Sequence, residues 1–242
     1  MNQEIITKAI VIKSVNYKDN DKILTLLTPE HGKISASLRG ANKPQAKLKF
    51  AGQLFCFAEF CLVQYGNNKT VKTATEIESF FDVAKDFEKL SIGSSLLEIS
   101  DKITKEGENC YSVFLNTLKA LQTLVFSSTS PKLILTKYML EVFRICGYEL
   151  IMDRCKSCGA KFNNNIFMNI ETGAFVCKLC KTDECMAVSL GAFNILKLVS
   201  NTEYSNLSSI KAHNHHLDEI LVLLNANFTG KFDIIIKSLK NI

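Results

Sequence analysis

The sequence predicts an α+β protein in which a small N-terminal β-barrel is followed by a helical body that carries a four-cysteine metal site. Three observations lead to this fold class. The first 80 residues read as short strands, one of which alternates apolar and polar residues with a period of two, whereas after Phe81 the apolar residues recur at helical spacing. Two C-x2-C pairs then lie 18 residues apart. We therefore expect a barrel domain over residues 1–80 and a helical domain over 81–242, with a metal-binding insert at about 150–185.

Five short segments read as strands, and turn signals separate them. They run from Ile6 to Ile12, Ile23 to Leu27, Lys33 to Leu38, Gln53 to Gln64 and Thr70 to Ile77. Asp19, Gly32, Gly40 and Gly66 mark the turns. A block of this size and strand number suggests an OB-fold. An SH3-like barrel or an open sheet would also fit the pattern.

The remainder of the chain reads as helices joined by short connections. The expected helices run from Leu90 to Ile103, Val113 to Phe126, Lys132 to Cys146, Ser189 to Val199, Leu217 to Leu224 and Asp233 to Lys240. Lys132 to Cys146 is the clearest, because Pro131 suits its first turn and Gly147 suits its end.

Composition allows a nucleic-acid partner without requiring one. The formal net charge is +5, and residues 1–80 hold 11 Lys and Arg against 7 Asp and Glu, so the excess positive charge lies on the expected barrel. No apolar run approaches the roughly 18 residues of a membrane span, and the N-terminus lacks the pattern of a secretory signal. We therefore expect a cytoplasmic protein with no membrane partner and reduced cysteines.

The two cysteine pairs predict one structural zinc ion. Cys155, Cys158, Cys177 and Cys180 have the C-x2-C-x18-C-x2-C spacing of a zinc ribbon or knuckle. Four thiolates complete a tetrahedral Zn²⁺ site and leave no open position for a catalytic water. Two disulfides, unpaired buried thiols or a thioredoxin-like redox pair are the alternatives.

The other five cysteines carry weaker signals. Cys56, Cys61, Cys110 and Cys146 lie in apolar surroundings and are expected to pack in the core. Cys185 is close enough in sequence to substitute for a ligand, but Cys180 has the better spacing.

A basic run without acidic residues extends from His31 to Lys49. Its cations are Lys33, Arg39, Lys43, Lys47 and Lys49. A basic loop of this kind can follow a phosphate backbone, although a solvated lysine-rich loop is the simpler interpretation. Tyr17 and Phe50 lie beside expected loops and are the candidates for base stacking.

No pattern in the sequence indicates catalysis, and we expect neither an enzyme nor a small-molecule substrate. Phosphate-cradling GxxxxGK[ST] and GxGxxG loops and the GxSxG elbow do not occur. His213, His215 and His216 form a cluster that reads as an exposed loop or cap, with a metal site as the less favoured alternative.

Several of these stretches, taken in order, resemble the RecO family of bacterial recombination-repair proteins. The most specific is the segment YKDNDKILTLLTPEHGK from Tyr17 to Lys33, followed by the Arg39-Gly40 step. LVQYG at residues 62–66, CGYEL at 146–150 and the segment from Phe167 to Val176 are also similar to the family. Spaced lysines stand where the family often carries arginines after the Arg-Gly step.

The resemblance implies an N-terminal OB-fold, a helical C-terminal domain and an embedded zinc site. It implies binding to single- and double-stranded DNA, annealing of complementary strands and partnership with RecR. It also implies contact with the C-terminal tail of single-stranded DNA-binding protein, which helps RecA load onto coated DNA. Lys137 and Arg144 are candidates for docking such an acidic tail.

Two other function classes remain open at this point. One is a non-catalytic scaffold whose barrel docks a partner protein. The other is an RNA-binding protein, since OB-folds also bind RNA.

Overall fold

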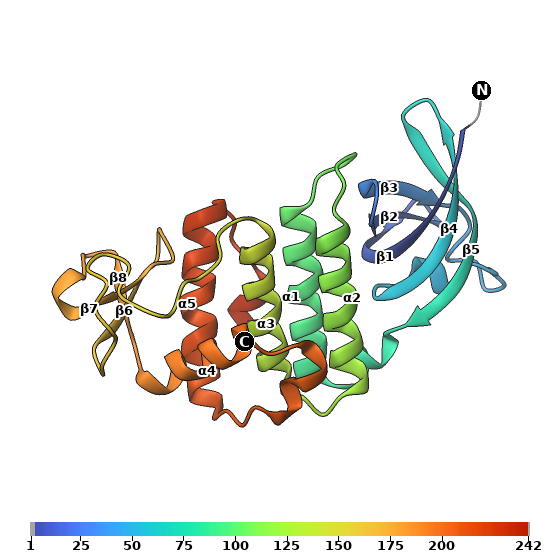
Figure 1. Ribbon diagram of the computed structural model, residues 1–242. Coiled ribbons are helices and arrows are strands. Elements are labelled where there is room, and N and C mark those ends of the chain that lie inside the picture. Colours follow the sequence, from blue (N-terminus) through green and yellow to red (C-terminus); the bar gives the residue numbers. More distant parts are fainter. Residues whose placement is uncertain (1–2, 242) are drawn as a thin grey trace. The chain divides into compact units, whose positions relative to one another are not determined.

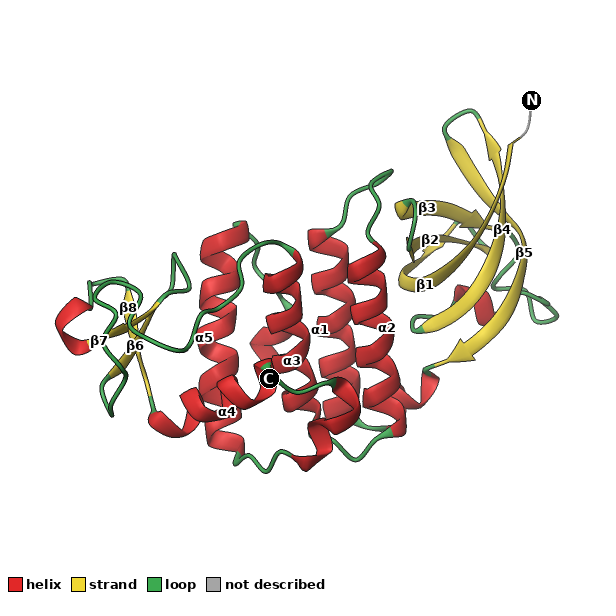
Figure 2. Cartoon of the chain, in the orientation of Figure 1, coloured by secondary structure: helices red, strands yellow, loops and turns green. Residues whose placement is uncertain are grey.

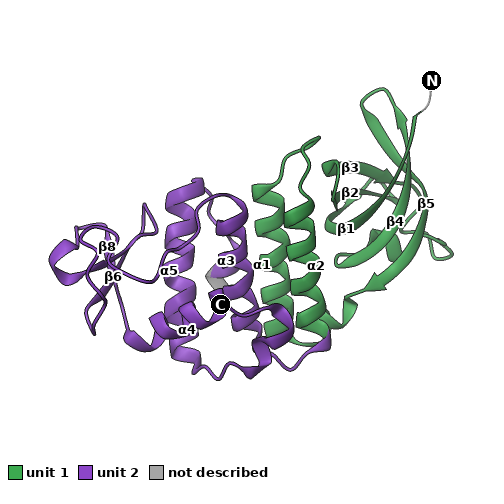
Figure 3. Ribbon diagram, viewed as in Figure 1, with its two compact units in different colours: residues 1–125 green, residues 126–242 purple. Residues whose placement is uncertain are grey.

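The computed structural model describes residues 3–241 and divides into two compact units (Figure 1). Unit 1 spans residues 1–125 and unit 2 spans residues 126–242 (Figure 3). No helix in the described part of the chain has the length and apolar character needed to cross a bilayer. The barrel strands end at Ser79, whereas the compact units divide at residue 125, and the domain boundary at residue 80 stays a prediction.

Unit 1 begins with a closed five-stranded barrel. The strands are β1 (Gln3–Tyr17), β2 (Asp21–Thr28), β3 (Gly32–Leu38), β4 (Cys56–Tyr65) and β5 (Asn68–Ser79). Their order is β1-β2-β3-β5-β4, and all neighbours are antiparallel except β3 and β5, which pair in parallel at Ser37 and Thr70 (Figure 2). This is the strand order of an OB-fold, so the predicted fold class is confirmed.

The alternating sequence pattern fills the barrel interior. In β3 the buried residues are every second one, Ile34, Ala36 and Leu38, as a strand with one face toward a core requires. Phe60 of β4 and Leu24 of β2 are completely buried in the same cluster. A register shift between Val11 and Lys13 lets the long β1 pair first with β4 and then with β2.

Two helices complete unit 1 and are tied to the barrel through its β2–β3 turn. They are α1 (Phe87–Ile103) and α2 (Tyr111–Phe126), preceded by a 3-10 turn at Phe81–Lys85. The connection between α1 and α2 forms a β-bridge from Glu106 to Gly32. Lys33 N donates to Lys105 O at 3.1 Å, and Gly107 N donates to His31 O at 3.0 Å. The helix pair is therefore joined to the sheet by backbone hydrogen bonds.

A charged contact lies beside this bridge. The carboxylate of Asp101 on α1 accepts Lys13 Nζ of β1 at 2.6 Å and Lys33 Nζ of β3 at 3.2 Å. Lys33 Nζ also donates to Asp101 O at 2.7 Å. Burial of Asp101, which is 7% exposed, opposes its ionisation, but the hydrogen bonds from the two lysines outweigh burial and lower the pKa of the carboxyl group.

Unit 2 is built on three helices and a small sheet. The helices are α3 (Pro131–Ile145), α4 (Leu190–Ser200) and α5 (Asn214–Phe232), with a 3-10 segment at Tyr204–Ser209. Aromatic side chains pack between α3 and α5, where the ring centroid of Phe143 lies 5.9 Å from that of Phe228.

The sheet has the order β7-β6-β8 and sits between α3 and α4 in the sequence (Figure 2). Its strands are β6 (Ile166–Asn169), β7 (Phe175–Cys177) and β8 (Cys185–Val188). The β6–β7 turn reaches α5, where the buried Asn227 donates through Nδ2 to Ile170 O at 2.8 Å. A Cβ on Gly230 of α5 would lie 2.9 Å from the same oxygen, so glycine permits the close approach of turn and helix.

Most expected elements are present, and the last expected helix is wrong. Asp233 to Lys240 was expected to be helical, but α5 extends to Phe232 and the chain then leaves the helix. Asp233 adopts a left-handed conformation with φ of 52°, and its N–H bonds Thr229 O as a cap. Among the described residues after Phe232, the 3-10 segment Ser238–Asn241 is the only helical turn.

Gly32 should be required for the attachment of the helix pair to the barrel. Its φ is +63°, and a Cβ there would overlap the carbonyl oxygen of Lys105 and lie 2.7 Å from Glu108 O. Gly66 has a similar φ of +58° but faces open space, so Gly66→Ala serves as the matched control. Both substitutions incur the cost of about 1–2 kcal/mol for a left-handed residue with a Cβ.

We predict that Gly32→Ala lowers the free energy of unfolding by at least about 2 kcal/mol more than Gly66→Ala, because backbone atoms must move as well. Urea denaturation of both variants measures the difference. Equal losses in the two variants would show that the contact with the α1–α2 connection contributes nothing.

Candidate metal centre and nucleic-acid interface

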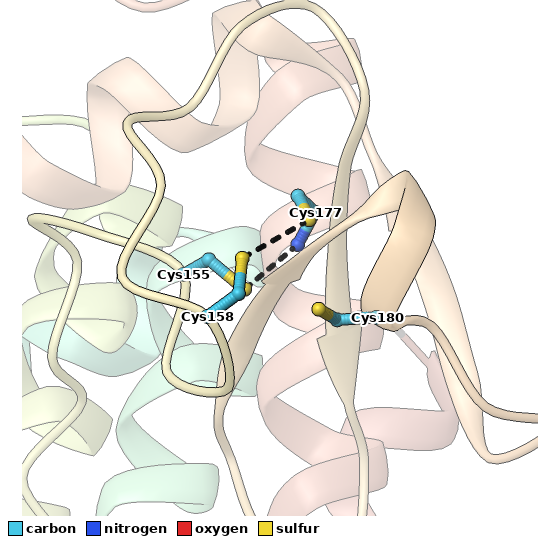
Figure 4. Close-up of side chains that lie close together, drawn as sticks. All are labelled: Cys155, Cys158, Cys177 and Cys180. Atoms are coloured by element: carbon cyan, nitrogen blue, oxygen red, sulfur yellow. Dashed lines mark hydrogen bonds between the residues drawn. The ribbon is translucent and has the colours of Figure 1, made fainter.

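The four cysteines of the two C-x2-C pairs converge in unit 2. Their sulfur atoms all lie within 4.8 Å of one another. Cys155 and Cys158 come from the loop before β6, Cys177 ends β7, and Cys180 ends the 3-10 turn that follows it (Figure 4). Figure 4 shows the four side chains directed toward a common centre. The structure therefore confirms that the two pairs come together, and the four thiols could hold one metal ion.

Backbone hydrogen bonds shape the two turns around the sulfur atoms. Cys177 N donates to Cys155 Sγ at 3.4 Å, and Gly159 N donates to Cys155 O at 2.9 Å, which closes the first turn. Lys156 N donates to Phe175 O at 3.0 Å and joins that turn to β7. N–H groups of Ser157 and Cys158 in the first turn and of Cys177 at the start of the second all bond the sulfur of Cys155, so the two turns meet at this sulfur.

The electrostatics of the cluster favour a bound cation. Burial opposes ionisation of Cys155, but N–H groups of Cys158, Cys177 and Ser157 bond its sulfur and lower its pKa to about 6. Hydrogen bonding of the Cys180 thiol to Cys158 and Cys177 raises the pKa of Cys180 to about 12. Four crowded sulfur atoms therefore cannot all ionise unless a divalent cation offsets their charge, and a tetrathiolate set of this kind fits zinc.

The five remaining cysteines lie outside this centre. Cys56 is buried in the barrel core, where burial raises its pKa to about 12. Cys61, Cys110 and Cys146 are partly buried. Cys185 begins β8, and its sulfur accepts Thr182 N at 3.4 Å, so it is held away from the four ligand positions.

The predicted basic loop is a chain of hydrogen-bonded turns on the barrel. Gly40 N donates to Asp21 Oδ1 at 2.8 Å and Asn42 N donates to Asn20 O at 3.0 Å, which anchors the loop to the β1–β2 connection. Further turns close at Lys43 and Lys49. Four cations of the run are exposed on this framework: Arg39, Lys43, Lys47 and Lys49.

Two residues of the predicted DNA-binding set, Lys33 and Phe50, are less exposed than its other members. The ammonium of Lys33 is paired with Asp101 and is only partly exposed. Phe50 is half-buried and packs against the barrel core. Tyr17 is 49% exposed at the end of β1, and the ammonium of Lys18 lies 5.3 Å from its ring centroid. Tyr17 is therefore the accessible member of the aromatic pair.

A depression of about 310 Å³ beside the basic loop adds residues that the sequence did not single out. It is lined by Arg39 at the end of β3, Val63 and Tyr65 of β4, and Thr70 and Lys72 of β5. Tyr65 is 56% exposed, and Lys72 forms an ion pair with Glu4 at 2.6 Å. The β4–β5 turn signal at Gly66 was visible in the sequence, but the approach of β5 to Arg39 depends on the parallel β3–β5 pairing.

The candidate residues for partner docking also differ from each other. Lys137 is 4% exposed, and its ammonium bonds Glu141 at 2.8 Å and Ser200 O at 3.2 Å, so it serves the packing of α3. Arg144 is exposed and pairs with the same Glu141 at 2.7 Å.

Comparisons with known proteins assign both parts of the chain to one family. The profile of "Recombination protein O N terminal" matches residues 1–80, and that of "Recombination protein O C terminal" matches residues 84–240. The chain is 29% identical over 216 residues to "DNA repair protein RecO" of Acetivibrio thermocellus, which covers 88% of this chain and 86% of that protein. It is 25% identical over 234 residues to the protein of the same name from Clostridium novyi, with 97% and 91% covered.

The two profiles together span almost the whole chain in the order barrel, then helices with the cysteine centre, which is also the order of the structure. The chain therefore belongs to the RecO family of DNA repair proteins.

Proposed function

We propose that this protein is a recombination mediator that binds single- and double-stranded DNA and anneals complementary strands. With RecR it would help load RecA onto DNA coated by single-stranded DNA-binding protein. The observation that carries the proposal is the exposed, ordered run of four cations on an OB-fold barrel in a chain of the RecO family. We expect it to act in the bacterial cytoplasm, associated with the nucleoid.

The basic loop would hold DNA by its phosphates. Arg39, Lys43, Lys47 and Lys49 face solvent, so each can displace a counterion from the backbone. Anchoring the loop through Asp21 and Asn20 fixes its backbone before DNA arrives, which reduces the entropy lost on binding. Lys33 contributes less to this role because its charge is already offset by Asp101.

The depression beside Arg39 would receive a base of a single strand. Its volume of about 310 Å³ and its exposed Tyr65 provide a stacking surface, while Arg39 flanks it with positive charge; the charge of Lys72 is offset by Glu4. Stacking on an aromatic ring tolerates every base, which suits a protein that must accept any sequence. Tyr17 offers a second exposed ring at the end of β1.

Annealing needs no catalytic group in this proposal. Phosphate contacts position a strand without reading its sequence. Two strands that repel each other in solution can approach on a positive surface, and base pairing then proceeds without chemistry by the protein. We therefore propose that the protein is not an enzyme.

The cysteine centre would hold one structural Zn²⁺ through Cys155, Cys158, Cys177 and Cys180. The ion offsets the charge of four thiolates and joins the two turns of the small sheet. Of the two candidate docking residues for the tail of single-stranded DNA-binding protein, the exposed Arg144 is the accessible one.

Reversing the charge of the basic loop should abolish strand annealing. We predict that a variant with Arg39, Lys43, Lys47 and Lys49 all changed to Glu anneals labelled complementary oligonucleotides no faster than the uncatalysed rate. In wild-type protein, each of these contacts should contribute about −0.7 to the slope of log affinity against log salt for a single strand. A stopped-flow annealing assay, with one strand precoated with single-stranded DNA-binding protein, measures the annealing rate, and fluorescence anisotropy with an uncoated single strand across a salt series measures the slope.

The matched control changes four exposed lysines outside the loop, namely Lys85, Lys102, Lys119 and Lys211, to Glu. It has the same net charge as the loop variant. Equal loss of annealing in both variants would mean that total charge, and not the loop, binds DNA. Full annealing by the loop variant would move the function to protein docking, and a preference for RNA over DNA of one sequence would move it to RNA.

Tyr65→Ala should weaken binding to single-stranded DNA selectively. Loss of one stacked base corresponds to about 1–3 kcal/mol, whereas binding to a duplex, whose bases are already stacked, should change little. Tyr65→Phe should retain wild-type affinity. Tyr111→Ala removes a similarly exposed ring from α2 and serves as the control. Fluorescence anisotropy with single-stranded and with duplex DNA measures the two affinities. Unchanged single-strand affinity in Tyr65→Ala would exclude the depression as a base site.

Removal of the metal should unfold the small sheet and leave the barrel folded. We predict that chelation, or Cys158→Ser, accelerates hydrogen exchange of amides in residues 155–188 while exchange in β1 to β5 is unchanged. Cys185→Ser, whose sulfur lies outside the centre, should retain one metal ion per chain by elemental analysis. Intact protection of residues 155–188 after complete chelation would contradict the structural role of the metal.

A further inference from the structure

A second group of exposed cations lies in unit 2, on the two turns that carry the four cysteines. We call residues 154–161 and 178–181 the cysteine turns, because they meet where the four sulfur atoms lie within 4.8 Å of one another (Figure 4). Neither turn contains an Asp or a Glu. Five exposed cations therefore gather around this centre: Arg154, Lys156, Lys161, Lys178 and Lys181.

The small sheet carries acidic residues at its other end. Strand β6 begins at the cysteine end, where Ile166 pairs with Cys177. Past the other end of β6, Ile170 N donates to Glu184 O at 3.1 Å, and Glu171 follows directly in the turn that reaches α5. Positive and negative charges are therefore separated along the length of the sheet.

Asp153 and Asp183 are the acids nearest to the cysteine turns in the sequence, but neither offsets the five cations. The carboxylate of Asp153 already accepts Lys197 Nζ of α4 at 2.8 Å. The chain has reached the far end of the sheet at Thr182, whose Oγ1 accepts Asn169 Nδ2 at 3.4 Å. Asp183 follows Thr182 and therefore belongs to the acidic end.

Neutralisation of the metal centre does not account for all of the positive charge. Four thiolates and one Zn²⁺ ion carry a net charge of −2, whereas the cysteine turns carry five cations, which leaves an excess of three. Within the described part of the chain, none of the five forms an ion pair with a carboxylate. The excess charge is therefore available to an anionic ligand.

An apolar side chain stands between two of these cations. Leu179 is 95% exposed in the 3-10 turn Lys178–Cys180, and Lys181 follows that turn. Apolar side chains such as leucine insert between bases where neighbouring cations hold the phosphate backbone. The combination of cations and an exposed leucine fits a nucleic acid better than it fits a polyanion without bases.

We propose that the cysteine turns bind a second single strand of DNA, with the five cations on its phosphates and Leu179 against its bases. The proposal rests on the DNA binding proposed above and extends it. Annealing requires two strands, so one chain would hold one strand on the basic loop of unit 1 and the other on the cysteine turns of unit 2.

Calorimetric titration of metal-loaded, full-length protein counts the bound strands. The probe is a single-stranded DNA of about eight nucleotides, which is within the site size of one OB-fold. We expect two strands per wild-type chain and one per chain when all five cations of the cysteine turns are changed to Gln. Elemental analysis verifies that this variant keeps its metal. One strand per wild-type chain, or two per variant chain, would overturn the proposal.

The salt dependence separates phosphate contacts from a change in net charge. Each lost contact should make the slope of log affinity against log salt less negative by about 0.7, so the Gln variant should differ from wild type by at least about 1.4. The matched control changes five other exposed lysines to Gln, namely Lys85, Lys102, Lys105, Lys119 and Lys211. A smaller difference, or an equal one in the control, contradicts phosphate binding by the cysteine turns.

The charge-reversed variant of the basic loop distinguishes failure here from failure of the barrel. It should bind one strand, and adding the Gln substitutions should remove that strand. If only the loop variant loses a strand, the barrel binds DNA and the present proposal is wrong. If only the Gln variant loses a strand, the cysteine turns bind DNA and the basic loop does not.

Leu179→Ala tests the contact with bases. In the loop variant it should weaken binding of the remaining strand at least threefold without changing the salt slope, because no cation is removed. Leu198→Ala removes an exposed leucine from α4 and serves as the control. Unchanged affinity in Leu179→Ala would overturn the base contact.

Discussion

The structure of unit 1 depends on one buried carboxylate. Asp101 is almost inaccessible, yet it stays ionised because Lys13 and Lys33 approach it from two different strands. Removing a charged group from water is costly, and removing one partner of a buried pair leaves a charge uncompensated. The contact therefore constrains position more than it adds net stability: α1 can pack only where β1 and β3 present both ammonium groups. The backbone bridge between Gly32 and Glu106 also fixes the position of α1 relative to the barrel, through the β2–β3 turn.

Tertiary contacts of this kind decide which parts of the candidate nucleic-acid surface could be predicted from the sequence. A run of cations after a strand marks the loop, and its exposed members Arg39, Lys43, Lys47 and Lys49 were all in that run. Lys33 lies in the same run, but in the structure its ammonium group pairs with Asp101. No local sequence pattern distinguishes Lys33 from the exposed cations. Tyr65 and Lys72 were missed because they approach Arg39 only through the parallel pairing of β3 with β5, which is a property of the closed barrel.

The period of the apolar residues and the spacing of the cysteines predicted the structure correctly where a local rule determines it. Alternation identified the barrel strands, helical spacing identified α1 to α3, and the C-x2-C pairs identified the cluster of four cysteines that could hold a metal ion. The sequence failed where a local helix cap or a tertiary contact decides. The expected helix from Asp233 is replaced by a left-handed cap, and β8, only four residues long, forms because β6 offers it an edge. Cys185 consequently lies in a strand, away from the ligand positions that its sequence proximity suggested.

The attachment of α1 to the barrel also has a consequence for the order in which the chain folds. A ribosome releases the N-terminal segment first, so all five strands emerge before Asp101 does, and local and sheet contacts of the barrel can form without it. Until then Lys13 and Lys33 remain solvated ammonium groups, which carry no penalty in water. The carboxylate that needs both of them is synthesised after them. If the barrel forms first, a nascent chain does not have to bury Asp101 unpaired, because residue 101 then joins residues 13 and 33 on a preformed surface.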